Sequence, residues 1–380
     1  MITVLTEPND EQTVQDTLWH GIISDASGTT GMRYVFDVYV NDEQLVRVKQ
    51  FPEPSNGAAY FDAGSSVRSQ MEYEWFTPTA NTLYLTPPNA SGEISLLYRV
   101  EYGEEVSGVT TANMASGQVR AYNYLPPLFG RKVSATPITD RLNSFFTNRN
   151  SRTQLSLTDN LFIGYYSDGA LEYTVKTFNA NNTMIALEVI SGGVDGFNQT
   201  NIGAGAINAE VANLINDAVK YYTVEFDGVE FRVDVICNGL YSPISLHFLN
   251  AWGMFDSARF GLVSKLSKTV ERKGYEKRDY RIVSNNVQYI DGNKYHEGKI
   301  NHDINYDHSY RLTMDAVDDL DANWLSELVS SSQVYAEIDG YFYPVTIKNN
   351  SYEYSKYINN RLQAFTIEID INQKRKSHLR

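Results

Sequence analysis

Short runs of β-branched and aromatic residues, separated by turns of Asn, Asp and Gly, constrain the fold of this chain more than any other feature. Residues 34–40 and 44–49 flank an Asn41-Asp42 turn, which predicts a hairpin. An Asp-Gly pair between β-rich runs is an even stronger hairpin signal, because both central residues of a type I′ turn need positive φ. Such pairs occur at Asp227-Gly228, Asp291-Gly292 and Asp339-Gly340. The chain is therefore expected to be mainly β.

The spacing of these runs favours a multi-domain protein with immunoglobulin-like β-sandwiches. Residues 106–150 interrupt the pattern, and Pro126-Pro127 within them cannot donate ladder hydrogen bonds. We expect four parts: an N-terminal β-sandwich at 1–105, a linker or extended arm at 106–152, a second β-sandwich at 153–250, and a C-terminal β domain at 251–380 with one or two short α-helices.

Two segments have helical periodicity. Ile207 to Val219 places apolar residues on one face and predicts a short helix. Residues 319–330 combine an apolar stripe around Trp324 with aspartates in the first turn, where the helix dipole favours acids, and predict a second helix. Three more strands follow, and the chain ends in a basic tail at 374–380.

The charge balance excludes some partner classes. The 380 residues contain 32 Lys and Arg against 46 Asp and Glu, a net charge of −14. Such an acidic chain is a poor fit to a nucleic-acid coat, so we expect no direct nucleic-acid partner. No apolar run approaches the 18 residues of a membrane span, and residues 1–10 lack a signal-peptide pattern. We expect neither membrane insertion nor secretion.

A search for catalytic motifs finds none. The chain has no Gly-x-Ser-x-Gly elbow, no phosphate-binding loop and no His-Glu-x-x-His helix. Gly203-Ala204-Gly205 lacks the third glycine of a dinucleotide fingerprint, which favours a flexible turn. The acids at 319 and 321 imitate a calcium loop, but Trp324 stands where that loop needs Gly, so helix capping explains them better. We expect no catalytic, cofactor-binding or metal-binding residues, and no enzyme.

The remaining reactive residue types have structural explanations. His302 and His308 lie six residues apart in a polar stretch that also contains His296, a spacing that favours exposed histidines. His20 and His247 lie in apolar surroundings and are expected in a core. The single cysteine, Cys237, ends an apolar strand and is expected to be a buried, inert thiol.

Two C-terminal stretches are distinctive. The first is Ser245–Phe260 (SLHFLNAWGMFDSARF), followed by residues 269–278; the second includes residues 332–337, 343–347, 351–354 and 359–369. Together with the hairpin at 34–48 and Tyr60-Phe61-Asp62, they resemble structural tail proteins, of the distal-tail or baseplate kind, of tailed phages and prophages of Bacteroidota-type hosts. Ala251 and Met254 depart from that pattern, and residues 106–210 have no counterpart in it.

The resemblance implies a virion component made in the host cytoplasm without a signal peptide. It implies rings of subunits that link the tail tube to the host-recognition apparatus, with copies of the same chain and other virion tail proteins as partners. The family has no catalytic residues, so none are transferred to this chain.

The residue pattern is consistent with a chain held by its neighbours. Tyrosine supplies large contact area at low rotamer cost, and the chain contains 27. The candidate interface residues flank the last hairpins or lie in the basic tail: Tyr341, Tyr343, Tyr352, Tyr354, Tyr357, Lys374, Arg375 and Lys376. The tyrosines can equally pack on their own sheet, and the tail can equally be a disordered end.

Two other functions remain open. Exposed aromatics favour a glycan-binding or receptor-binding adhesin module on sandwich domains, with host-surface glycans as partners. Paired carboxylates such as Glu368 and Asp370 allow a glycosidase. The isoleucines that alternate with these acids favour another interpretation, in which the acids lie on the solvent-exposed face of a strand whose other face packs on a core.

Overall fold

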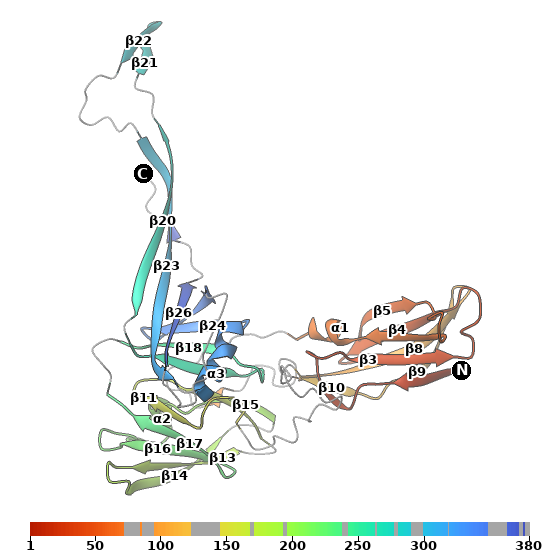
Figure 1. The fold of residues 1–380 in the computed structure, drawn as a ribbon, viewed down its shortest axis with the longest axis horizontal. Coiled ribbons are helices and arrows are strands. Elements are labelled where there is room, and N and C mark those ends of the chain that lie inside the picture. Colours follow the sequence, from red (N-terminus) through yellow and green to blue (C-terminus); the bar gives the residue numbers. More distant parts are fainter. Residues whose placement is uncertain are drawn as a thin grey trace. The chain divides into compact units, whose positions relative to one another are not determined.

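The computed structural model describes residues 1–71, 84–85, 95–122, 145–167, 171–192, 196–237, 242–262, 264–276, 280–289, 299–317, 319–348, 363–371 and 375–376. The chain divides into two compact units. One comprises Met1–Cys237 and His247–Ser257, and the other comprises Asn238–Leu246 and Ala258–Arg380. Both are built mainly from antiparallel sheets, so the predicted mainly-β class is confirmed (Figure 1).

The N-terminal part of the first unit is a β-sandwich. One sheet has the order β1-β3-β6 and the other has the order β2-β10-β8-β4-β5, with β9 paired to β8. These strands are β1 (Ile2–Thr6), β2 (Glu11–Thr13), β3 (Trp19–Ser24), β4 (Arg33–Val40), β5 (Glu43–Gln50), β6 (Ala58–Asp62), β8 (Ser95–Val106), β9 (Val109–Ala115) and β10 (Val119–Tyr122). The order β10-β8-β4-β5 corresponds to the G-F-C-C′ order of immunoglobulin variable-type sheets, and β1-β3-β6 corresponds to A-B-E.

Alternation along the strands builds the core of this sandwich. Phe36 of β4, Phe61 of β6 and Tyr102 of β8 are buried and meet between the two sheets. The Asn41-Asp42 turn has positive φ at both residues, so the hairpin predicted there is confirmed.

The sheet continues beyond the predicted domain boundary. β9 and β10 both pair with β8, so residues 109–122 belong to the N-terminal sheet instead of a linker. The sequence predicted a linker because this stretch is rich in Gly, Ser, Thr and Asn. Backbone hydrogen bonds to the long strand β8 do not require an apolar run, so the stretch can still form strands. The divisions at 152 and 250 stay predictions. A short helix, α1 (Gly64–Arg68), was not predicted.

A second pair of sheets forms the rest of the first unit's core. The five-stranded sheet has the order β11-β17-β16-β13-β14 and the three-stranded one β12-β15-β7. Their strands are β7 (Tyr84–Leu85), β11 (Arg152–Leu155), β12 (Phe162–Ser167), β13 (Leu171–Phe178), β14 (Met184–Gly192), β15 (Gly196–Asn201), β16 (Tyr221–Phe226) and β17 (Val229–Val235). Tyr165, Val175 and Phe231 are buried in the shared core. Asp227 and Gly228 both have positive φ, which confirms that hairpin.

The first predicted helix is displaced. The structure has α2 at Ala204–Glu210, and Val211 is already extended. The Asn208 side chain accepts a hydrogen bond from the Ile215 amide and donates one to its carbonyl, at 2.8 and 2.7 Å. This clasp holds 211–215 in turns. Gly203 is the N-cap of α2, so the flexible turn expected there is wrong. The position needs glycine because a Cβ there would lie 2.4 Å from the Asp159 carbonyl oxygen.

The last part of the chain contributes an eight-stranded sheet. Its order is β19-β18-β24-β25-β26-β23-β20, with β27 paired to β23. The strands are β18 (Ile244–Leu249), β19 (Phe255–Phe260), β20 (Lys265–Glu276), β23 (Lys299–Val317), β24 (Val334–Ile338), β25 (Tyr341–Ile347), β26 (Gln363–Ile371) and β27 (Arg375–Lys376). β21 (Tyr280–Val283) and β22 (Asn286–Tyr289) form a separate hairpin.

The second predicted helix is confirmed as α3 (Asp319–Ser330), with Trp324, Leu325 and Leu328 buried. Asp339-Gly340 has the positive φ values of the predicted turn. The predicted hairpin at Asp291-Gly292 lies outside the described residues.

Candidate functional site

The most reactive-looking pair in the first unit is buried. Ser257 Oγ lies 2.8 Å from His247 Nδ1 and accepts a hydrogen bond from the Phe162 amide at 2.9 Å. A serine hydroxyl beside an imidazole nitrogen has the composition of a nucleophile–base pair, with the direction of the hydrogen bond set by the tautomer of His247. Ser257 is only 3% exposed and His247 is 0% exposed. The hydroxyl is therefore shielded from solvent, and the pair joins β18 to β19, with the Phe162 amide adding a link to β12.

The same stretch contains a bend fixed by one asparagine. Asn250 Oδ1 accepts hydrogen bonds from the Trp252 and Met254 amides, at 2.9 and 3.0 Å. Its Nδ2 donates to the Phe146 carbonyl at 2.8 Å, and Gly253 supplies the positive φ that the bend needs. The distinctive Asn-x-x-Gly sequence is thus a structural turn. No feature of the sequence indicated that Phe146 is the partner of Asn250.

A buried polar chain crosses the N-terminal sandwich. Tyr102 donates to Glu7 Oε1 at 2.9 Å, so the Tyr102 oxygen accepts from His20 Nδ1 at 2.8 Å. The Tyr98 hydroxyl then donates to His20 Nε2 at 3.4 Å. These hydrogen bonds are all compatible with a neutral His20 imidazole that is protonated on Nδ1. Burial lowers the pKa of His20 from 6.5 to about 4, against the opposing effect of Asp62.

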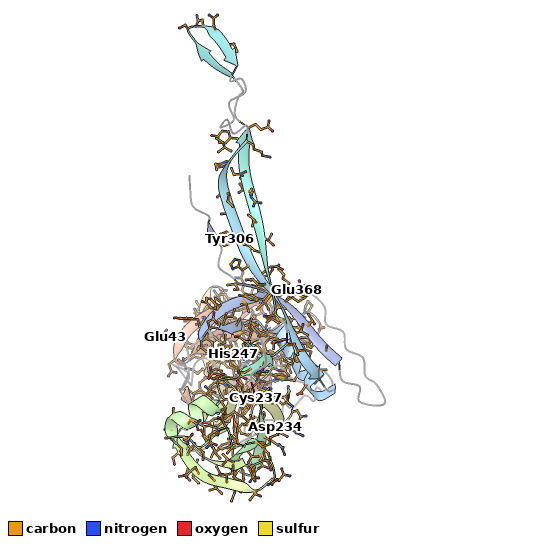
Figure 2. The ribbon with its side chains drawn as sticks, turned by 90° about the vertical axis from the view of Figure 1, so that its left-hand side faces the viewer. Glu43, Asp234, Cys237, His247, Tyr306 and Glu368 are labelled. Atoms are coloured by element: carbon orange, nitrogen blue, oxygen red, sulfur yellow. The ribbon has the colours of Figure 1, made fainter. Side chains whose placement is uncertain are left out.

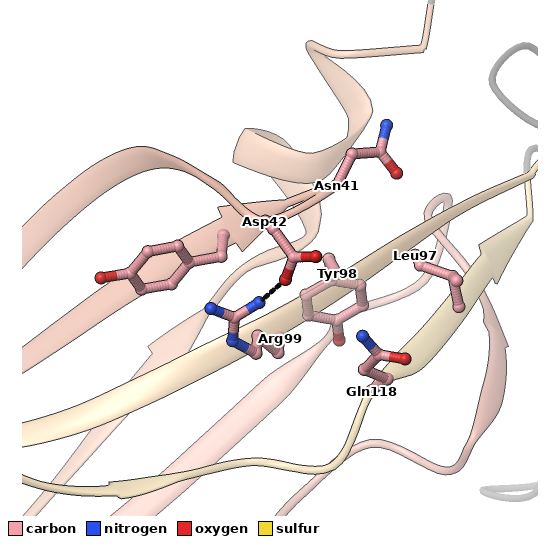
Figure 3. Close-up of a pocket in the computed structure, with 7 residues that line it drawn as sticks. Asn41, Asp42, Leu97, Tyr98, Arg99 and Gln118 are labelled. Atoms are coloured by element: carbon pink, nitrogen blue, oxygen red, sulfur yellow. Dashed lines mark hydrogen bonds and ion pairs between the residues drawn. The ribbon is translucent and has the colours of Figure 1, made fainter.

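A shallow recess of about 270 Å³ lies beside the β4–β5 turn, on the sheet that contains β4 and β8 (Figure 3). Arg99 at its centre forms an ion pair with Asp42, and its guanidinium lies 4.5 Å from the centre of the Tyr39 ring. Asn41 and Gln118 complete the polar wall. Its cation is already neutralised by a carboxylate and covered by a ring, so the recess has the composition of a structural cluster.

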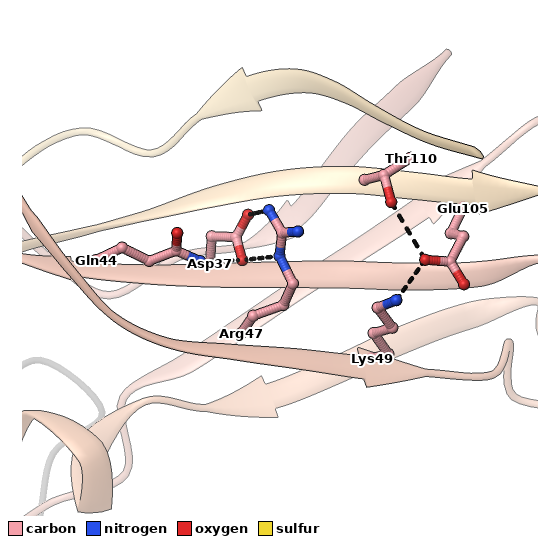
Figure 4. Close-up of polar contacts among 6 residues, drawn as sticks. All are labelled: Asp37, Gln44, Arg47, Lys49, Glu105 and Thr110. Atoms are coloured by element: carbon pink, nitrogen blue, oxygen red, sulfur yellow. Dashed lines mark hydrogen bonds and ion pairs between the residues drawn. The ribbon is translucent and has the colours of Figure 1, made fainter. Parts of the chain in front are cut away.

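The outer face of β4, β5, β8 and β9 carries further paired charges (Figure 4). Arg47 makes two hydrogen bonds of 2.7 Å to Asp37, and Gln44 donates to the same carboxylate at 2.9 Å. Lys49 and Thr110 both donate to Glu105, and the Lys49 hydrogen bond lowers the pKa of that carboxyl. These ion pairs cross between neighbouring strands and stabilise the sheet.

The second unit contains a long two-stranded ribbon. β20 and β23 pair from Lys265↔Arg311 to Glu276↔Lys299. β26 pairs with β23 only between Ser309 and Val317, and β27 only at Asn305 and Tyr306. Every β20 side chain except Val270 is exposed. Figure 2 shows the ribbon carrying Tyr306, with side chains projecting from it. Such a surface is available for contact along much of its length.

Charge is distributed unequally along the chain. The first unit contains 14 Lys and Arg against 29 Asp and Glu, and the second contains 18 against 17. The net charges are therefore −15 and +1. Within β20 alone, Lys265, Lys268, Arg272 and Lys273 outnumber two glutamates. β20 is thus a net positive strand in an acidic protein.

The structure describes only some of the predicted interface residues. Tyr341 is 68% exposed on β25 and its ring centre lies 6.5 Å from that of the half-buried Tyr343. Arg375 and Lys376 form β27 and pair with the ribbon strand β23. Tyr352, Tyr354, Tyr357 and Lys374 lie outside the described residues. Their interface role stays a prediction.

Other predicted residues are placed clearly. His20 and His247 are buried, as expected. Cys237 is exposed, contrary to the expected buried thiol, because β17 ends at Val235 and Cys237 lies two residues beyond it. Glu368 and Asp370 form separate ion pairs with Arg311 and Lys348, at 2.9 and 2.8 Å, on the opposite face of β26 from the buried isoleucines.

Metal ions and membranes would each require a recognisable group of side chains or a recognisable helix. Among the described residues, no three His, Cys, Asp or Glu side chains are grouped so that they could hold a metal ion. In the same part of the chain, no helix has the length and apolar character needed to cross a membrane. Comparison with known proteins adds no name: no protein-family model matches the chain, and no curated protein matches it.

Proposed function

We propose that this chain is a non-enzymatic structural subunit that assembles with copies of itself and with other proteins in the tail tip or baseplate of a tailed phage. The observation that carries the proposal is the exposed ribbon of β20 and β23. A two-stranded ribbon is marginal in water by itself, yet this one keeps Leu266 56% and Tyr275 53% exposed. A different tail protein that covers these side chains would stabilise it.

The buried chemistry supports the same proposal. The Ser257–His247 pair joins β18 to β19, the hydrogen bonds of His20 join β3 to β8, and the cation in the recess is paired with Asp42. Polar groups used in this way rigidify a scaffold. The phage location rests on the sequence resemblance of residues 245–278 and 332–369.

The proposal is tested on particles released by the strain that encodes the chain. Mass spectrometry of purified particles should detect the protein at a fixed copy number, and antibody labelling should place it at one end of the tail. Its absence from intact particles would overturn the phage location. Measurement of molar mass in solution separately tests whether the chain assembles.

Glycan binding is the second candidate, and one feature favours it. Trp19 of β3 is 47% exposed and Tyr60 of β6 is 40% exposed. The register Trp19↔Asp62 and Gly21↔Tyr60 puts both rings on the same face of their sheet. Aromatic faces of this kind stack on sugars. Trp19→Ala should abolish binding on a glycan array, whereas Phe51→Ala, at a ring covered by Arg33, should not.

A further inference from the structure

The strand β14 is an unusual edge. It is the last strand of the order β11-β17-β16-β13-β14, and within the described residues it pairs only with β13 (Figure 1). No described strand pairs with the backbone N–H and C=O groups of its other edge. Four of its nine residues are exposed and apolar, with exposed fractions of 46 to 53%: Met184, Ile185, Leu187 and Val189.

The devices that normally protect an edge are nearly absent from β14. Natural edges carry Lys, Pro or inward-pointing charges, or are short. β14 contains no Pro and no Lys, and its one charged residue, Glu188 on the inner side, is the only protecting charge among its nine residues. A bulge at Ile185 is the one irregularity, and from Ala186 to Gly192 the strand is regular. An edge of this composition is a template for another strand.

The side chains of β14 from Ala186 to Ile190 alternate between the two faces of the five-stranded sheet. Ile190 is buried in the core, so Ala186 and Glu188, at even spacing from it, share the inner side. Leu187 and Val189 therefore project from the outer face. On that face the neighbouring strands carry ion pairs, such as Lys176–Glu225 and Arg232–Asp234. The exposed aliphatic side chains Leu187 and Val189 thus belong to the edge strand, while the stacked rings of Phe178 and Tyr221 lie on the same face of β13 and β16.

The sequence of β14 is complementary to itself in one register. A two-fold axis that extends the sheet keeps each residue on its face, so one residue must lie opposite its own copy. Centring on Leu187 places Ile185 opposite Val189 and Ala186 opposite Glu188. Centring on Glu188 would oppose two like charges, and centring on Val189 would put Glu188 beside Ile190.

We infer that β14 pairs antiparallel with β14 of a second copy of this chain, with Leu187 opposite its symmetry mate. The two five-stranded sheets then form one continuous sheet. This inference rests on the proposed function as an assembling subunit, and it names the surface and the partner. The contact is isologous, so it joins subunits in pairs, and rings need a further contact of another kind.

Cysteine cross-linking tests the register. The background is Cys237→Ser, which removes the only native cysteine at an exposed position. Leu187→Cys in this background should form a disulfide-linked dimer on mild oxidation, because directly opposed residues lie about 4.5–5.5 Å apart at Cα, within disulfide range. The matched control is Leu266→Cys on the edge strand β20, which is similarly exposed and should stay monomeric on a non-reducing gel.

The outcomes separate this inference from the proposed function. A Leu187→Cys dimer, with at least tenfold more cross-linked product than Leu266→Cys, supports the β14 contact. If the parent chain forms oligomers by molar mass but Leu187→Cys does not cross-link above the control, the β14 contact is wrong and assembly by another surface stands. If the parent chain is monomeric up to hundreds of micromolar, both the contact and self-assembly are overturned.

Discussion

Two edge strands of this protein carry opposite sequences. β14 has one charge in nine residues, whereas β20 has six charged residues in twelve, four of them basic. Both leave one edge without a partner among the described strands, and both expose leucine side chains. Lysine on an edge opposes strand addition, because pairing would desolvate its charge. Exposure alone therefore does not identify a pairing surface. Charge on the strand separates β14, the edge proposed to pair, from β20, where pairing would desolvate charged side chains.

A charge placed on β14 is the strongest test of the difference between the two edges. Leu187→Lys puts two ammonium groups opposite each other in the paired state and removes two leucines from the contact. We expect self-association to weaken about 100-fold or more. Sedimentation velocity over a concentration series measures it. Leu266→Lys, the same change on β20, should leave self-association unchanged; equal loss in both variants would contradict the distinction between the edges.

The two faces of β14 provide the next test. In the monomeric Leu187→Lys background, Ile190→Ala should lower the free energy of unfolding by about 2–5 kcal/mol, because Ile190 is 5% exposed and its loss leaves a cavity. Val189→Ala in the same background should cost less than about 1 kcal/mol, since Val189 is 53% exposed. Urea unfolding measures both. Similar losses would mean that the outer face is already buried within one chain.

Proton linkage separates the edge from the folded core. Folded His20 has a pKa of about 4 against 6.5 when unfolded, so the unfolded chain binds more protons between these values. The stability associated with His20 is complete above pH 6.5 and is lost as pH falls toward 4, by about 3 kcal/mol in total. β14 contains no histidine, so self-association should hold from pH 7.5 to 6 while stability begins to fall.

The control for this prediction is His20→Gln. Glutamine does not titrate in this range, so the variant should lose that part of the pH dependence. Urea unfolding at several pH values gives the slope. An unchanged slope in His20→Gln would assign the dependence to other groups.

Local sequence predicted the hairpins and one helix well, because their geometry is set within a few residues. Asp227-Gly228 and Asp339-Gly340 need only their own positive φ values. The apolar stripe around Trp324 likewise defines α3 without reference to distant strands. These features carry their cause in adjacent residues, so a single sequence is enough to find them.

The features that sequence missed depend on partners far along the chain. The clasp of Asn208 on Ile215 overrode a helical pattern. The pairing of β10 with β8 was hidden because residues 119–122 have no distinctive local pattern. Residues 184–190 are rich in apolar and β-branched side chains, as strands are, but the edge position of Leu187 depends on the absence of a further described strand beside β14. Nothing in the sequence of residues 184–192 reports that.

The smallest expected effect concerns the charged edge. Lys268 Nζ lies 3.7 Å from the centre of the Tyr306 ring across the ribbon, a cation–π contact. At an exposed site such a contact contributes about 0.5–1 kcal/mol, so Lys268→Ala should destabilise the second unit by no more than that. Lys268→Arg should retain the contact and the stability. Hydrogen exchange of the β20 amides measures the local change. A much larger loss of protection in Lys268→Ala would mean that the ribbon depends on its own side chains and not on a neighbour.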